Sequence, residues 1–149
     1  TKGDIIRPQY ISGESVVERS IIGEGAEIYG EVHNCVIGAD VTIEKGAVVR
    51  DSIIMKHTRI GAGSQIDKSI IAESVDIGEN VVTGVGEEAP NVLKPAVYGF
   101  GLVTIAEKSV IPSGVKIGKN TAISGETPVE DYPDGELVSG GAIVKKDGE

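Results

Sequence analysis

Large aliphatic residues recur along this chain at a spacing that fits neither an amphipathic helix nor an isolated strand. Within each repeat they stand six, six and five residues apart, so that the pattern returns every seventeen residues. The central run is Ile37, Ile43, Val49, Ile54, Ile60, Ile66, Ile71 and Ile77, and the β-branched Thr83 takes the next place. A fixed period of this length is typical of repeat architectures, in which each unit stacks on the next. The pattern predicts a coil with three short strands in each turn.

A second set of positions supports this prediction. Strand side chains alternate between the two faces, so the residue two places before each large aliphatic should also point inward. These positions hold small or β-branched residues: Ala26, Val41, Ala47, Thr58, Ser64, Val75, Val81, Val103, Ser109, Val115 and Thr121. Small residues fit the tight inner corners of a triangular coil of parallel strands. We therefore expect an all-β chain that forms a triangular solenoid.

Four pairs of charged residues seventeen apart carry opposite signs. The pairs are Arg50 with Asp67, Asp51 with Lys68, Lys56 with Glu73, and Arg59 with Asp76. In a stacked coil these residues would be neighbours in adjacent turns. Each exposed pair would contribute only ~0–1 kcal/mol, so the pairs indicate register more than stability. One turn is shorter, with fifteen residues from Ile22 to Ile37.

The period lapses over residues 84–104. Continuing it would bury Glu88 and Lys94, which is costly for unpaired charges. The stretch GVGEEAPN also has the composition of turns. We therefore expect an excursion here. Because Ile105 lies two full periods after Ile71, the excursion is interpreted as replacing one whole turn.

The chain is expected to be a single β-helix domain over residues 1–149. Its expected parts are a linker at 1–9, coil at 10–83 and 105–123, the excursion at 84–104, and an irregular tail at 124–149. The tail is expected to run back along the coil, with a strand at residues 142–144. Because the chain begins at Thr1 and its sole methionine is Met55, we interpret it as a piece of a longer protein or as a processed one.

Composition narrows the class of protein. There are 20 Ile and 19 Val but only 3 Leu, and β-branched residues favour strands over helices. The net charge of −9 argues against nucleic acid or an acidic membrane surface as a partner. No apolar run reaches the ~18–20 residues of a membrane span. With one cysteine and no signal peptide, we expect a cytoplasmic protein.

Candidate chemistry is sparse. His33 and His57 are the only histidines, and a zinc site of the three-histidine type needs one more. Cys35 falls in the inward register and is interpreted as a core residue. Lys56 and Arg59 could hold a small anionic effector, but their interpretation as partners of the carboxylates in the next turn is preferred. No catalytic, cofactor or metal site is predicted in this chain.

One face of the predicted coil is apolar over four turns, whereas the next face is polar. The outward residues of the apolar face are Ile21, Val36, Ile53, Met55, Ile70 and Ala72. A continuous apolar face usually marks a docking surface. We expect this face to pack against another domain or subunit; the alternative is that the chain's own tail covers it.

Several segments also carry a family resemblance. The segments PQYIS, SIIGEGAEIYGEV, DSIIM, YGFGLVTI and EDYPDG occur at spacings found in the C-terminal domain of glucose-1-phosphate adenylyltransferases. The chain resembles that domain along essentially its whole length. The resemblance implies a left-handed parallel β-helix of hexapeptide repeats, since spacing alone does not show the hand.

The resemblance also implies a function. Members make ADP-glucose and diphosphate from ATP and glucose 1-phosphate, with Mg²⁺, for glycogen biosynthesis. That chemistry belongs to an N-terminal nucleotidyltransferase domain with a Gly-rich phosphate loop, which this chain lacks. We therefore expect an inactive regulatory and assembly domain, within a tetramer of one subunit type or a hetero-oligomer with a paralogue.

Two other interpretations stay open. The chain could be the β-helix of a different sugar-phosphate nucleotidyltransferase, such as a mannose-1-phosphate guanylyltransferase. It could also be a free-standing hexapeptide acyltransferase in which His57 acts as general base.

Overall fold

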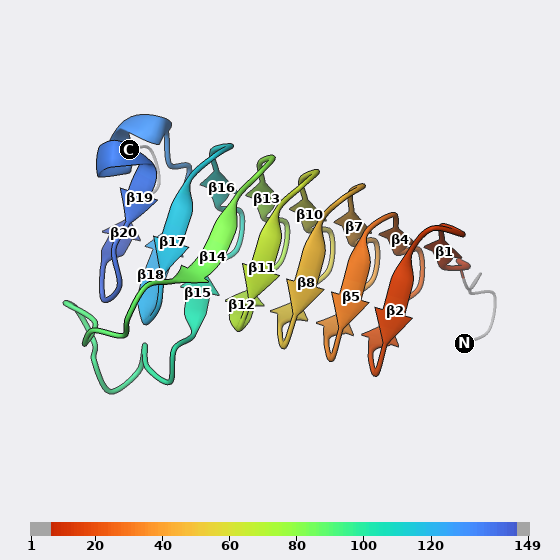
Figure 1. Ribbon diagram of the computed structural model, residues 1–149, viewed down its shortest axis with the longest axis horizontal. Helices are drawn as coiled ribbons and strands as arrows, with labels where there is room; N and C mark the ends of the chain where they lie inside the picture. The colour runs from red at the N-terminus through yellow and green to blue at the C-terminus, as the bar shows by residue number, and fades with distance from the viewer. Residues whose placement is uncertain (1–6, 146–149) are drawn as a thin grey trace.

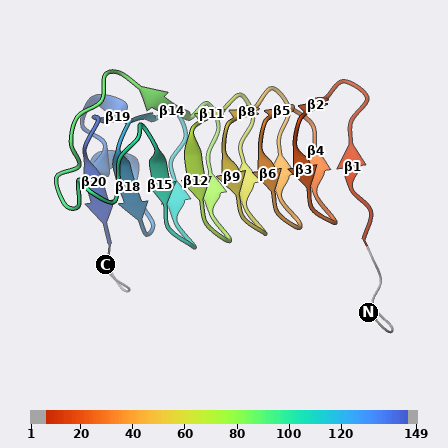
Figure 2. The same ribbon diagram turned by 90° about the horizontal axis from the view of Figure 1, so that it is seen from below.

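The chain forms a coil of short parallel strands, described over residues 7–145 in a computed structural model. About eight turns wind in a left-handed triangular solenoid (Figure 1), and the second view shows the turns stacked like the layers of a prism (Figure 2). The predicted all-β class and the parallel β-helix are confirmed. Left-handed connections are rare where a helix crosses over between parallel strands. That preference arises because the crossover helix must pack back onto the sheet. Here each connection consists of two further short strands, so the preference does not apply.

Three parallel sheets form the faces of the prism. Sheet A contains β1 (Tyr10–Ile11), β4 (Glu27–Ile28), β7 (Thr42–Ile43), β10 (Arg59–Ile60), β13 (Asp76–Ile77) and β16 (Val110–Ile111). Sheet B contains β2 (Val16–Glu18), β5 (Glu31–His33), β8 (Val48–Arg50), β11 (Gln65–Asp67), β14 (Val82–Val85), β17 (Lys116–Gly118) and β19 (Glu136–Leu137). Sheet C contains β3 (Ile21–Ile22), β6 (Val36–Ile37), β9 (Ile53–Ile54), β12 (Ser69–Ile71), β15 (Val103–Ile105), β18 (Thr121–Ser124) and β20 (Ala142–Val144).

The strand register follows the seventeen-residue period. Ile60 pairs with Ile43 on one side and with Ile77 on the other. The shortened turn also has a visible cause. Only Tyr29 and Gly30 link β4 to β5, whereas four residues, 44–47, link β7 to β8 one turn later. The corner loop is therefore two residues shorter, whereas the strands keep their length and their inward-facing positions.

The interior is a column of isoleucines. The largest fully buried side chains are Ile28, Ile37, Ile43, Ile54, Ile60, Ile66, Ile71, Ile77, Ile105, Ile111, Ile117 and Ile123. Burying each such side chain stabilises the fold by about 1.5–3 kcal/mol. Inward hydroxyls are satisfied by the backbone, as where Thr58 Oγ1 donates to the Ala72 carbonyl at 2.8 Å and Ser64 Oγ to the Gly78 carbonyl at 2.9 Å. These polar groups therefore sit in the core at little cost.

The geometry of the corners explains why glycine follows several of the large aliphatic residues. A Cβ atom added at Gly61 would overlap the backbone of Gly78 in the next turn, although the φ angle of Gly61 is not positive. Close approach of successive turns, and not a special φ, therefore requires glycine there. Elsewhere at the corners single residues take positive φ, including Asn34 at 56° and Asp51 at 50°.

The excursion occupies residues 86–102, between β14 and β15. The interpretation that it replaces a whole turn is wrong, because β15 pairs directly with β12, Val103 opposite Ser69. The sheets continue without a gap. The excursion is an insertion at the corner between sheets B and C, of the same length as one turn, and this length accounts for the doubled period.

The expectation that the tail runs back along the coil is also wrong. Residues 124–145 add a further turn, in which β19 pairs with β17 and β20 with β18. The expected strand at residues 142–144 is present as β20. On the sheet A side, two 3₁₀ turns, Val129–Asp131 and Pro133–Gly135, take the place of a strand. They place Tyr132, which is 2% exposed, against the end of the core. Because these turns contain more residues than a strand and its corner, the seventeen-residue period cannot be seen in this part of the sequence.

No helix in the described range, residues 7–145, has the length and apolar character needed to cross a membrane.

Candidate functional site

The outward side of sheet C is an apolar strip. Ile21 lies beside Val36, Val36 beside Ile53, and Ile53 beside Ile70 in successive strands. The exposed fractions are 69% for Ile21, 44% for Val36, 42% for Ile53 and 38% for Met55, while Ile70 and Ala72 are half-buried. All six residues of the expected face therefore lie on this one side, and we call them the apolar strip.

The chain's own tail does not cover the apolar strip within the described residues. The last strand, β20, pairs with β18 at the C-terminal end of sheet C and adds to the sheet's length. The strip lies on β3, β6, β9 and β12 and just after β9 and β12, toward the N-terminal end. The alternative in which the tail hides this face is wrong for residues up to 145.

The predicted pairs of charges are in register but mostly do not touch. Arg59 Nε lies 3.2 Å from Asp76 Oδ1. In the part of the chain that the structure describes, the other three predicted pairs have no ion pair within 4.0 Å. Asp51 instead accepts a hydrogen bond from Asn34 Nδ2 at 2.9 Å. Lys56 is thus an exposed ammonium without a close carboxylate among residues 7–145, whereas Arg59 is already paired.

His57 stands on the exposed corner between sheets C and A. Its backbone has a φ of 63°, and its Nδ1 lies 3.6 Å from Asp40 Oδ2. Asp40 also accepts from Arg7, whose guanidinium lies 3.5 Å from Glu24. The hydrogen bond and the charge of Asp40 raise the pKa of Arg7. His57 is therefore one member of an exposed polar corner, and its role as a general base belongs only to the acyltransferase alternative.

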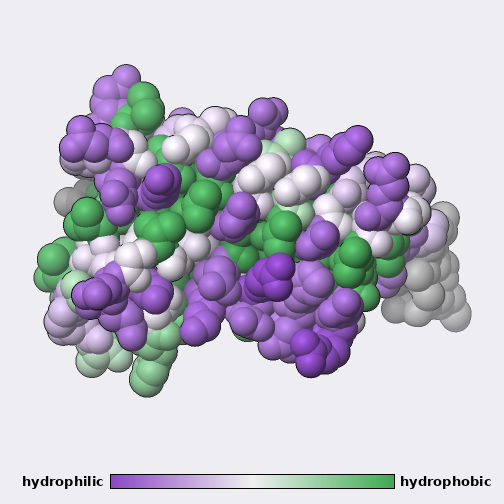
Figure 3. Space-filling view, in the orientation of Figure 1, coloured by the Kyte–Doolittle hydropathy of each residue, from purple (hydrophilic) through white to green (hydrophobic). Residues whose placement is uncertain are grey.

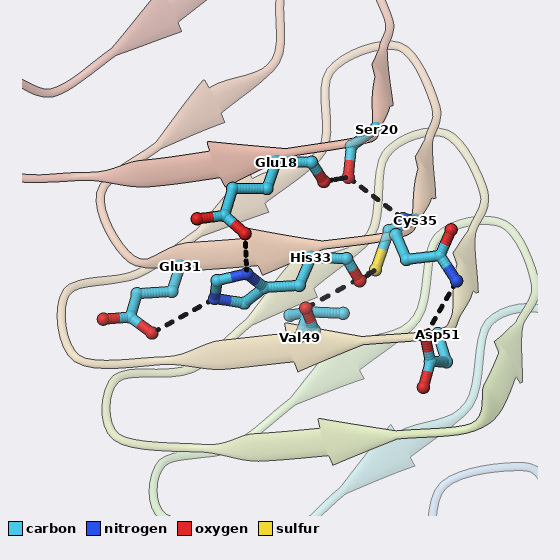
Figure 4. A network of polar contacts seen from close by, with 8 residues as sticks. Glu18, Ser20, Glu31, His33, Cys35, Val49 and Asp51 are labelled. Atoms are coloured by element: carbon cyan, nitrogen blue, oxygen red, sulfur yellow. Dashed lines mark hydrogen bonds and ion pairs between the residues drawn. The ribbon is translucent and has the colours of Figure 1, made fainter.

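A histidine between two carboxylates was not singled out from the sequence as a site. Figure 4 shows His33 on the outer side of sheet B, with Nδ1 3.3 Å from Glu18 Oε2 and Nε2 3.4 Å from Glu31 Oε2. The shortened turn is the signal that could have found it, because the fifteen-residue spacing sets Glu18 beside His33. No group of three or more metal-ligating side chains occurs in the described residues.

Cys35 lies just beyond His33 and behaves as a core residue. The thiol is buried, and its Sγ donates to the His33 carbonyl at 3.2 Å (Figure 4). Burial raises the pKa of the Cys35 thiol, so the reactive thiolate is disfavoured. The interpretation of Cys35 as part of the interior agrees with this geometry.

The shortened corner opens a recess of about 210 Å³ on the outer surface. The recess is lined in part by Tyr29, Gly30 and Lys45, and also by Glu14 and Glu31. The lining thus includes two acidic residues and one basic residue, so the local charge opposes an anion. An anionic effector is therefore disfavoured in this recess and must be sought elsewhere on the coil.

The match to a known protein family agrees with this coil of repeated turns. The family model described as GlmU-like, C-terminal hexapeptide matches residues 9–93. The chain belongs to the GlmU-like C-terminal hexapeptide family. The hexapeptide of this family corresponds to one face of the coil, an inward aliphatic followed by a corner.

Three similar proteins are all named glucose-1-phosphate adenylyltransferase. A glucose-1-phosphate adenylyltransferase of Lachnospira eligens is 61% identical over 97% of this chain and 34% of its own length. Enzymes of that name from Acetivibrio thermocellus and Thermotoga maritima are 41% and 42% identical over 91% and 94% of this chain. The chain spans about a third of the length of these relatives. The resemblance stated from the sequence is confirmed.

Proposed function

We propose that this chain is the C-terminal β-helix domain of a glucose-1-phosphate adenylyltransferase. The complete polypeptide would transfer an adenylyl group from ATP to glucose 1-phosphate, giving ADP-glucose and diphosphate for glycogen biosynthesis. Residues 1–149 would be inactive alone, because their coil holds no Gly-rich phosphate loop.

The observation that carries the proposal is the 61% identity over 97% of the chain, combined with coverage of only 34% of the relative. A segment of related sequence is thus joined, in the relative, to a further two-thirds of polypeptide. That remainder has the size of a separate catalytic domain. The chemistry would reside there, together with the Mg²⁺ that such a phosphoryl site uses.

The role left to the coil is assembly and regulation. The apolar strip supports this role, since a soluble chain rarely leaves such a face uncovered. Its partners would be the nucleotidyltransferase domain of the same polypeptide and other subunits, in a tetramer of identical or paralogous chains. We place the enzyme in the cytoplasm, with neither nucleic acid nor membrane as a partner.

A small anionic effector would bind near Lys56 and Arg59. Lys56 supports this placement because its ammonium has no carboxylate within 4.0 Å among the described residues. Arg59 could contribute only by releasing Asp76, which lies 3.2 Å away. An effector that binds here would therefore compete with an existing ion pair.

The test uses the complete polypeptide that contains this chain. We expect it to form ADP-glucose from ATP and glucose 1-phosphate, whereas residues 1–149 alone form none. Formation of GDP-mannose from GTP and mannose 1-phosphate in place of ADP-glucose would assign the chain to a guanylyltransferase. Acetyl transfer by residues 1–149 that is lost in His57→Ala and kept in His33→Ala would overturn the proposal in favour of an acyltransferase.

A further inference from the structure

The excursion meets two corners of the coil between β14 and β15. One corner, residues 119–120, links β17 to β18; the other, residues 138–141, links β19 to β20 in the final turn, residues 124–145. Figures 1 and 2 show the excursion, in green, reaching the end of the coil that carries β20. A segment inserted after β14 therefore contacts turns that follow it in the chain.

Two buried asparagines hold the excursion at the first of these corners. Asn120 is 7% exposed; its Nδ2 donates to the Ala89 carbonyl at 3.0 Å, and its Oδ1 accepts from the Gly101 amide at 2.8 Å. Asn91 is 3% exposed, and its Nδ2 donates to the Asn120 carbonyl at 2.9 Å. The beginning and the end of the excursion are thereby fixed to the turn before the final one.

The excursion also contacts the corner of the final turn directly. The Val92 amide donates to the Gly140 carbonyl at 2.9 Å, and Asn91 Nδ2 donates to the Gly141 carbonyl at 3.3 Å. A Cβ atom added at Gly140 would overlap the Pro90 carbonyl. The final turn and the backbone of the excursion are therefore packed against each other, in addition to being hydrogen-bonded.

The final turn has fewer contacts with the coil than an interior turn has. In a solenoid each turn is stabilised by its neighbours, and a terminal turn has a neighbour on one side only. The final turn also contributes no strand to sheet A, because the 3₁₀ turns at residues 129–131 and 133–135 take its place. The excursion therefore supplies part of the contact that a further turn would otherwise provide.

Hydrophobic burial contributes little to holding the excursion in place. Four of its large apolar side chains are exposed, Val92 by 74%, Leu93 by 56%, Val97 by 64% and Phe100 by 89%, and Figure 3 shows hydrophobic groups at the surface of this end of the molecule. The φ angle of Phe100 is 62°, a conformation that bulky residues avoid and that persists only where the surroundings hold it. The contacts with the two corners therefore keep the excursion in place.

We propose that the excursion acts as a releasable strap on the C-terminal end of the coil. Its docking holds the final turn closed, and the excursion and the final turn open together as one unit while the earlier turns stay closed. Proteins open locally in contiguous cooperative units of this kind. The contacts of Asn91 and Val92 with the corner of the final turn carry the proposal. It does not depend on the catalytic activity of the longer polypeptide.

The first test changes the excursion and follows hydrogen exchange in the final turn of residues 1–149, whose closed core makes them a folded unit. Asn91→Asp keeps a side-chain oxygen for the amides of Leu93 and Lys94 but loses the amino group that donates to the coil. We expect exchange across β19 and β20 to accelerate about tenfold, and exchange across β6 and β9 to stay unchanged. Lys94→Ala, in the same loop, is the matched control and should leave β19 and β20 unchanged.

The second test runs in the opposite direction, because a coupling free energy between two parts is reciprocal. Ile143 packs against the core from β20, so Ile143→Ala weakens the final turn and leaves the residues of the excursion intact. We expect exchange at the amides of Leu93 and Lys94 to accelerate about tenfold. Ile22→Ala is the matched control: Ile22 is also partly buried but lies in β3, at the other end of the coil, so these amides should not respond.

Three results would overturn the strap. Faster exchange in Asn91→Asp that is confined to the excursion would show that the final turn closes without it. An equal acceleration across β6 and β9 would show that the whole coil opens and that its end is not a separate unit. If Asn91→Asp does not fold, Ile143→Ala still decides, because unchanged exchange at Leu93 and Lys94 in that variant would show that the two parts are not coupled.

Discussion

Asn91 Nδ2 donates a hydrogen bond to the backbone carbonyl of Asn120 at 2.9 Å, joining the excursion to the corner of the following turn. A second bond from the same amide reaches the Gly141 carbonyl at 3.3 Å, one turn further. One buried side chain thus ties the loop to two successive turns. The order of the excursion depends on this contact, because the loop's own apolar side chains point into water.

We expect Asn91→Ala to loosen the excursion without unfolding the coil. Loss of buried hydrogen bonds costs about 1–3 kcal/mol, which corresponds to about a 5- to 150-fold rise in local opening. Hydrogen exchange at the Leu93 and Lys94 amides, which the Asn91 side chain holds, should accelerate by that factor. Lys94→Ala, at an exposed position of the same loop, serves as control. Equal exchange rates in both variants would show that Asn91 does not hold the loop.

The column of isoleucines predicts a sharp contrast between neighbouring residues of one strand. Ile60 is 0% exposed, whereas Arg59 points outward beside it. We expect Ile60→Ala to lower the free energy of unfolding by about 2–5 kcal/mol, and Arg59→Ala by less than about 1 kcal/mol. Denaturant unfolding measures both changes. Similar losses for the two variants would contradict the inward and outward assignment.

The close approach of successive turns predicts a penalty for one added methyl group. Gly61→Ala places a Cβ against the Gly78 backbone, and only a shift of the turn can relieve the overlap. We expect a loss of unfolding free energy of about 1–3 kcal/mol, the range for an overpacked site. A Cβ at Gly13 meets nothing within 4 Å, so Gly13→Ala should be neutral or slightly stabilising. Thermal unfolding of the two variants compares them, and a greater loss for Gly13→Ala would refute the role of stacking.

Tyr132 predicts a loss of stability at alkaline pH. Burial raises the pKa of Tyr132 from its ordinary value of 10.0, because the phenolate would be desolvated. A group whose pKa is raised by folding contributes fully below its unfolded pKa, and its contribution falls as the pH rises through the folded value. Stability should therefore decline above about pH 10. Thermal unfolding between pH 8 and 11.5 should show a weaker decline in Tyr132→Phe, with Tyr98→Phe as control. The same decline in Tyr132→Phe would show that another group titrates.

The coil could be predicted from the sequence because the residues that build it recur at a fixed period. Every turn solves the same packing problem, so Ile43, Ile60 and Ile77 mark the register by themselves. The pairs of opposite charges indicated the same register but did not predict ion pairs. Arg50 and Asp67 are opposite each other in adjacent strands, yet they form no ion pair within 4.0 Å among residues 7–145. Exposed long side chains gain too little to hold one geometry.

The excursion and the last turn could not be predicted in the same way. Their order depends on single buried contacts, those of Asn91 with Asn120 and of Tyr132 Oη with Thr127 Oγ1 at 2.9 Å. Such contacts do not repeat and therefore leave no period in the sequence. The apolar strip could be found because it repeats from turn to turn, whereas the exposed apolar residues of the excursion, Val92, Leu93, Val97 and Phe100, lie in a segment without a period.

The most direct test of the central claim is a chimera. The segment of the Lachnospira eligens enzyme that aligns with this chain at 61% identity would be replaced by these residues, and ADP-glucose formation and subunit assembly would be measured. If this chain is the β-helix domain of such an enzyme, the chimera should assemble as the parent does and form ADP-glucose within about tenfold of its rate. A folded chimera that neither assembles nor forms ADP-glucose would contradict the account.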